Sequence, residues 1–164
     1  MSAASGPERD GFVVVRPGDP RTRPLLEGLH LEYVVRYGPE IGAEEMAHHP
    51  VDDFTVPTGA LLLLLEDGVT VGGGAFRRHD DATAELKRVW TAPAHRRRGI
   101  SRRVLAELER LAAAAGYRRI YLTTGSRQPE AFALYRRSGY VLLPGTAQIY
   151  PGGVYDVGFE KHLR

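Results

Sequence analysis

The sequence contains no cysteine among its 164 residues, so disulfide bonds, a thiol nucleophile and a thiolate metal site are all excluded. It also lacks any run of about 18 apolar residues, the length that a membrane-spanning helix requires. The longest apolar run, Ala60 to Leu65, has the length of a strand. No basic and apolar segment typical of a secretion signal lies near Met1. We therefore expect a cytoplasmic protein with no membrane partner.

Charge is nearly balanced over the whole chain but is concentrated in one segment. The net charge is +2, yet residues 95–119 carry eight arginines against two glutamates, so the remainder is net acidic. A charge placed in this way attracts an anionic partner to one face, whereas a nucleic-acid-binding surface spreads its charge more widely. His48 and His49 are adjacent, so on a helix they point in different directions, and no third ligand is evident. We expect no metal site.

The order of the predicted elements indicates one α/β domain over residues 11–164, after a flexible leader at residues 1–10. The elements are a strand at 12–15, helices at 24–37 and 41–49, antiparallel strands at 60–65, 69–76 and 83–91, a helix at 99–115, a strand at 119–124, a helix from 129 to 138, and a hairpin of 140–143 and 154–160. A right-handed crossover through helix 99–115 places its two flanking strands parallel. The fold class is a mixed, mostly antiparallel sheet of about six or seven strands with helices on both faces. Gly72 to Gly74 indicate either a bulge or the close passage of a ligand.

The segment HRRRGIS, His95 to Ser101, joins a predicted strand to a predicted helix. A helix N-terminus has unpaired N–H groups and a partial positive charge, so three arginines at that point indicate an anionic ligand. Gly99 lets the backbone approach such a ligand closely. The segment is neither a Walker loop nor a dinucleotide fingerprint, because it has one glycine and no Gly-Lys-Ser/Thr.

A second motif follows the strand at 119–124. The segment RQPEAFALYRRSGY, Arg127 to Tyr140, resembles the Asn-x-x-Ala-x-x-Leu-Tyr-x-x-x-Gly-Phe/Tyr motif of the GCN5-related N-acetyltransferase (GNAT) family, with Gln128 in the place of Asn. The arginine segment is similar to that family's Arg/Gln-x-x-Gly-x-Gly/Ala motif, with Ser101 at its last position. The resemblance is close from about Ala84 to Tyr140 and implies a splayed pair of parallel strands at the cofactor site.

The resemblance implies acetyl-CoA as cosubstrate. Its pantetheine arm would pair with the backbone of residues 89–91, and its phosphates would lie on the turn at residues 96–102. The hydroxyl of Ser101 is a further donor to phosphate. The cofactor-binding residues expected from the resemblance are Val89, Trp90, Thr91, Arg96, Arg97, Arg98, Gly99, Ile100, Ser101, Arg102 and Gln128.

By the same resemblance, Tyr135 is the general acid that protonates the departing thiolate. Glu85 is the candidate base, because strict strand alternation would put Glu85, Lys87, Val89 and Thr91 on one face. An ordered water is the alternative base, and Glu85 would then pair with Lys87 or a neighbouring strand, or point to solvent. The candidate substrate-binding residues are Tyr33, Tyr37 and Tyr150.

The expected function is therefore the transfer of an acetyl group to a primary amine of a small molecule or peptide, by direct attack in a ternary complex. Two alternatives remain open: an acyl-CoA-binding regulatory relative without catalysis, and a basic nucleic-acid-binding module. The second lacks the aromatic residues that such modules interleave with their basic ones. We expect no nucleic-acid partner, and the resemblance is compatible with a homodimer.

Overall fold

A twisted sheet of eight strands forms the centre of the protein, in a computed structural model that describes residues 10–40, 51–145, 148–149 and 155–164. The strand order is β1, β2, β3, β4, β5, β8, β6, with β7 also paired to β8. The strands are β1 (Gly11–Val15), β2 (Ala60–Glu66), β3 (Val69–Arg78), β4 (Thr83–Thr91), β5 (Arg119–Gly125), β6 (Val141–Leu142), β7 (Gln148–Ile149) and β8 (Tyr155–His162). Every neighbouring pair is antiparallel except β4 and β5, which confirms the predicted mixed sheet.

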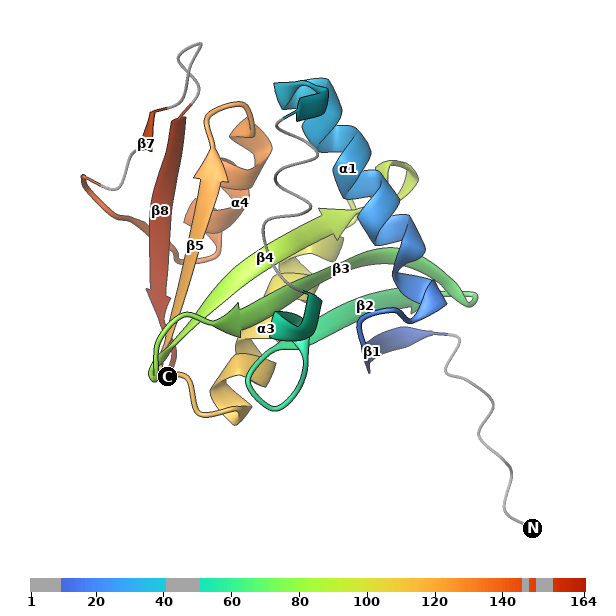
Figure 1. The fold of residues 1–164 in the computed structure, drawn as a ribbon, viewed down its shortest axis with the longest axis horizontal. Helices are drawn as coiled ribbons and strands as arrows, with labels where there is room; N and C mark the ends of the chain where they lie inside the picture. Colours follow the sequence, from blue (N-terminus) through green and yellow to red (C-terminus); the bar gives the residue numbers. More distant parts are fainter. Residues whose placement is uncertain (1–9, 41–50, 146–147, 150–154) are drawn as a thin grey trace.

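Within the described residues, three α-helices cover the two faces of the sheet. Helix α1 (Arg23–Tyr37) lies on one face, while α3 (Ile100–Ala114) and α4 (Pro129–Arg137) lie on the other (Figure 1). Short 3-10 helices η1 (Pro20–Thr22), η2 (Val51–Phe54) and η3 (Pro93–His95) occupy connections. The helix expected at residues 41–49 and the leader at residues 1–9 lie outside the described residues. No helix of the described chain is long and apolar enough to cross a membrane.

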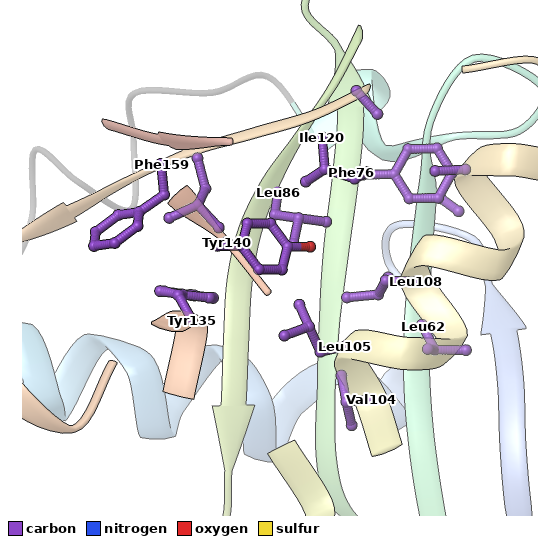
Figure 2. Close-up of a cluster of buried hydrophobic side chains, with 14 of the residues drawn as sticks. Leu62, Phe76, Leu86, Val104, Leu105, Leu108, Ile120, Tyr135, Tyr140 and Phe159 are labelled. Carbon is purple, nitrogen blue, oxygen red and sulfur yellow. The ribbon is translucent and has the colours of Figure 1, made fainter. Parts of the chain in front are cut away.

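The core has two layers, one on each side of the sheet. The layer under α3 and α4 is made of aliphatic and aromatic side chains that Figure 2 shows packed together, including Leu62, Phe76, Leu105, Ile120 and Phe159. The layer under α1 contains Leu25, Leu29, Leu63 and Trp90, among others. Because helices cover both faces, β2 is buried along almost its whole length, which accounts for its unbroken run of leucines.

The three glycines of β3 let the helices approach the sheet. A Cβ atom at Gly72 would lie 2.8 Å from the Ile100 side chain, and one at Gly74 would lie 2.8 Å from that of Leu108. Both of these neighbours belong to α3. Of the two readings offered by the sequence, the bulge is confirmed, because the register of β3 shifts next to Gly72 against β2 and at Gly74 against β4. The group that approaches these glycines closely is a helix of the same chain. The glycines therefore fix the position of α3, whose first turn forms part of the site.

Candidate active site

The parallel pair of β4 and β5 is joined over only three residues. Thr83, Ala84 and Glu85 are in register with residues 119–121, and beyond that point the two strands are no longer paired (Figure 1). A pocket of about 760 Å³ lies at this divergence and reaches the arginine turn. The predicted site residues that line it are Tyr33, Val89, Trp90, Thr91, Arg96, Arg97, Gly99, Ile100, Ser101, Arg102, Gln128 and Tyr135. The structure thus brings together most of the residues that the motifs indicated.

A bulge in β4 changes which residues face each side of the sheet. Lys87 is opposite Ala75, while Trp90 is opposite Gly73, so β4 contains one more residue than β3 over this stretch. Arg88 occupies the bulge with a φ of 60°, in the left-handed region. The prediction that positions 85, 87, 89 and 91 share one face is therefore wrong, because strict alternation does not survive a bulge.

Opposite sides of β4 therefore serve different parts of the pocket. Before the bulge, Glu85 and Lys87 share a face with their β3 partners Arg77 and Ala75, and Ala75 belongs to the core layer under α1. Beyond the bulge, Val89 packs against the layer under α3. Thr91 shares a hydrogen bond of 2.7 Å between its Oγ1 and the Oγ of Ser101, the second residue of α3. The last residue of β4 and the first turn of α3 are thereby tied together.

The backbone of the turn that precedes α3 has a conformation typical of anion-binding sites. Arg97 and Gly99 both have left-handed backbone conformations, with φ of 64° and 73°. Gly99 is the N-cap of α3 and no side chain caps the helix. Alternation of left- and right-handed residues turns successive N–H groups toward one point, and the first N–H groups of the helix add to them. The turn is therefore suited to a phosphate.

The arginines of this turn differ in what they contact. Arg96 forms an ion pair with Glu32 of α1. Arg98 binds Glu66 through two hydrogen bonds of 2.8 and 3.0 Å, and this guanidinium holds the pKa of the Glu66 carboxyl below its usual range. By contrast, the side chains of Arg97 and Arg102 have no ion-pair or hydrogen-bond partner among the described residues. Arg96 and Arg98 therefore brace the turn, while Arg97 and Arg102 are the cations left for a ligand.

Tyr135 lies in α4 at the inner wall of the pocket. Its side chain is buried, with only 8% exposed, and it packs edge to face on Tyr140 and against Phe159 (Figure 2). Burial raises the pKa of Tyr135 to about 12. The phenol is therefore protonated throughout the neutral range, which is the state that a proton donor needs.

Glu85 is held by an arginine of the neighbouring strand. Its Oε1 accepts a hydrogen bond of 2.8 Å from Nε of Arg77, whose Nη1 lies 3.1 Å from Oδ2 of Asp53. Burial acts to lower the pKa of Arg77, but the ion pairs with Glu85 and Asp53 outweigh it and the pKa is raised. Glu85 does not line the pocket. The structure therefore contains the pairing of Glu85 with a neighbouring strand, which the sequence left open as an alternative.

The end of α1 is fastened to the loop between β5 and α4. Nη1 of Arg36 donates to the carbonyl oxygen of Arg127 at 2.8 Å, and Nη1 of Arg127 donates to the carbonyl oxygen of Arg36, also at 2.8 Å. Nε2 of Gln128 lies 3.3 Å from the hydroxyl of Tyr37, which also contacts Gly125. Tyr37 therefore orients Gln128 and does not line the pocket itself. Tyr150 lies outside the described residues.

Several pocket residues carry no motif signal in the sequence. Lys87 follows the divergence of β4 and β5. Thr124 of β5 also lines the pocket, and its buried hydroxyl has no hydrogen-bond partner among the residues that the structure describes. Glu32 and Glu66 reach the arginine turn from α1 and from β2. Strand alternation signals the face that Lys87 shares with Glu85 but not its place in a pocket, and the two ion pairs join residues 64 and 32 positions apart.

Comparisons with known proteins agree with this geometry. The family model described as the acetyltransferase (GNAT) family matches residues 26–140. An acyl-CoA N-acyltransferase structure from Klebsiella pneumoniae is 26% identical, with a TM-score of 0.72 over 94% of this chain and 98% of that one. A Salmonella typhimurium acetyltransferase solved with acetyl-CoA shares the fold at 17% identity and a TM-score of 0.70, over 96% and 95% of the two chains.

A curated relative, an IAA acetyltransferase of Azospirillum brasilense, is 35% identical over 85 residues. That alignment spans 51% of this chain and 56% of the relative. The family match, by contrast, extends from α1 to the end of the second motif and includes the split strands, the arginine turn and Tyr135. From its sequence and its site alike, this chain belongs to the GNAT family of acetyltransferases.

Proposed function

We propose that the protein transfers an acetyl group from acetyl-CoA to a primary amine of a small molecule or peptide, by direct attack of the amine in a ternary complex. The observation that carries this proposal is that one continuous pocket runs from the turn at Arg97 and Gly99, which have left-handed backbone conformations, to the buried phenol of Tyr135. Structures of similar fold solved with coenzyme A or acetyl-CoA support it.

The turn fits the phosphate end of the cosubstrate. Its convergent N–H groups and the guanidinium groups of Arg97 and Arg102 would hold phosphate oxygens, while Arg96 and Arg98 keep the loop in place through their own carboxylates. The backbone of residues 89–91 faces the gap left by the diverging strands and would pair with an extended arm as a further strand does. Thr124 offers a buried hydroxyl on the other wall.

Bound acetyl-CoA supplies an acyl carbon activated by its thioester. The amine nitrogen attacks that carbon, a C–N bond forms, and the C–S bond breaks. Tyr135 then delivers its phenolic proton to the departing sulfur, and its raised pKa keeps that proton available. The proton lost by the amine goes to an ordered water, because Arg77 already holds the Glu85 carboxylate. Glu85 is then a residue that fixes β4 rather than the base.

Thermal unfolding with added ligands tests the proposal. A ligand at one hundred times its dissociation constant stabilises the folded state by about 2.7 kcal/mol, which raises the melting temperature of a chain of this size by about 5–10 °C. We expect this rise with acetyl-CoA and CoA and none with duplex DNA. Arg97→Gln should reduce the rise, whereas Arg16→Gln, an exposed arginine outside the pocket, should not.

Catalysis is tested by following thiol release over a panel of primary amines. The wild type should release CoA only when an accepted amine is present, and Tyr135→Phe should lower turnover by about a hundredfold, the contribution typical of a general acid. A melting shift with DNA alone contradicts the proposal. Binding of acetyl-CoA without turnover on any amine would favour the non-catalytic relative instead.

A further inference from the structure

The pocket holds a lysine that lies apart from the phosphate site. Lys87 lines the pocket just beyond the last registered pair of β4 and β5, Glu85 with Tyr121. Its side chain is half-buried and has no hydrogen bond or ion pair among the described residues. An ammonium group without a counter-charge, on a side chain that lines a pocket where two strands diverge, can form a charge-assisted hydrogen bond with an anionic ligand.

The carboxylates around Lys87 are already engaged. Glu85, two residues away on the same face, accepts from Arg77 at 2.8 Å. Glu130 is 3.0 Å from Arg36, and Glu32 pairs with Arg96. Each acidic group that lines the described pocket therefore has its own arginine. Among the described residues that line the pocket, no acidic group is left to balance the charge on Lys87.

The phosphates of a bound CoA would not balance it either. Lys87 and Thr91 lie opposite Ala75 and Gly72 of β3, which are three residues apart and hence about 10 Å of extended strand, and the arginine turn starts beyond Thr91. Lys87 is on the α1 side of the sheet, and the bulge at Arg88 puts Val89 and Thr91 on the α3 side. A phosphate group on the turn and the ammonium of Lys87 are thus at different ends and on different faces.

We propose that Lys87 binds a carboxylate at the acyl end of the pocket, which makes the protein selective for an anionic reaction partner. This inference rests on the proposed function and specifies its substrate class. The carboxylate has two possible sources: the acceptor, as an amine that carries a carboxylate group, or the acyl group, as the free carboxylate of a dicarboxylic acyl-CoA. In both cases the reaction keeps the same bonds, and Lys87 is a specificity-determining residue that forms a charge-assisted hydrogen bond.

Two binding comparisons distinguish the sources, both at low ionic strength because salt screens the interaction. For the acceptor, CoA-loaded protein is titrated with a panel of N-acetyl amino acids and with their uncharged amides. For the acyl group, the protein is titrated with succinyl-CoA and with butyryl-CoA, which has the same chain length. We expect the anionic member of one comparison to bind about tenfold more tightly, or 1.4 kcal/mol.

Lys87→Met should lower the ratio of the two affinities to about one. Lys87→Arg should retain most of the preference for the anionic ligand. Arg16→Met changes the net charge by the same amount outside the pocket and should leave the preference intact. Absence of any preference in both comparisons, or a preference that persists in Lys87→Met, overturns the inference while CoA binding still supports the proposed function. Failure of the wild type to bind CoA overturns both the inference and the proposed function. The melting shift with CoA distinguishes this result from the loss of the inference alone.

Discussion

Replacing Glu85 by Gln separates the two roles that this residue can have, a base or one half of a buried ion pair. Its side chain is 8% exposed and that of Arg77 is 26% exposed, with 2.8 Å between Oε1 and Nε. Removing one partner of a fully buried pair costs about 3–5 kcal/mol, and of an exposed pair about 0.2–1 kcal/mol. Arg77 keeps Asp53 as a second partner. We therefore expect Glu85→Gln to destabilise the protein by about 2 kcal/mol, an intermediate value.

That loss corresponds to a fall in melting temperature of about 4–8 °C for a chain of this length. A double-mutant cycle with Arg77→Gln should give a coupling free energy of about 1–2 kcal/mol. Glu107 and Arg110, an exposed pair on α3, provide the matched control, because their cycle should give no more than about 0.5 kcal/mol. The reasoning is refuted if the Glu85 coupling is as small as this control.

The kinetic profile gives a second readout for the same variants. If Glu85 fixes β4 and water is the base, folded Glu85→Gln should keep kcat/KM within about tenfold of the wild type. If Glu85 is the base, the same variant should lose about a hundredfold or more in kcat/KM. These two patterns are mutually exclusive.

Three further predictions concern buried residues of the site and its support. Because burial raises the pKa of Tyr135 to about 12, the wild type should lose up to about 1.4 kcal/mol of stability per pH unit as the pH rises from 10 to about 12, and Tyr135→Phe should reduce this loss in urea unfolding. Gly28→Ala puts a Cβ atom 2.5 Å from Nε1 of Trp90, so it should cost about 1–3 kcal/mol and change the fluorescence of the single tryptophan. An unchanged spectrum and melting temperature would contradict that packing. Gly125→Ala should clash with the Tyr37 hydroxyl and lower the melting temperature, and adding Tyr37→Leu should recover part of the loss.

The sequence alone was enough to predict the fold class and the main part of the pocket. The strong apolar patterns of β2 to β5 and α3 identified these elements, and the glycine and proline residues at their ends predicted their bounds to within a few residues. The strand expected at 140–143 is present as the two-residue β6, paired with β8 as predicted. The two-residue β7 carries no such signal, and it brings the sheet to eight strands rather than the expected six or seven. The roles predicted for Tyr135 and for the arginine turn stay predictions.

The faces of β4 could not be predicted, because they depend on one extra residue in the strand. Alternation holds through Lys87 and is broken at Arg88, whose left-handed backbone has no marker in the local sequence. The sequence also does not show that Arg96 forms an ion pair whereas Arg97 has none among the described residues. Three consecutive arginines look equivalent in a sequence, and only the position of Glu32 on α1, 64 residues away from Arg96, distinguishes them. Such long-range pairing is a property of the packed chain.

The short registered segment between β4 and β5 also has a consequence for isotope exchange. Amide hydrogens of β4 and β5 that point into the unpaired gap have no backbone acceptor there, so in the ligand-free protein they should exchange with deuterium much faster than those of Thr83 to Glu85. A ligand that pairs with residues 89–91 should slow exchange on that stretch and leave the already protected β2 unchanged. A peptide-level exchange map would thus locate the bound arm without a crystal and before any acceptor has been identified.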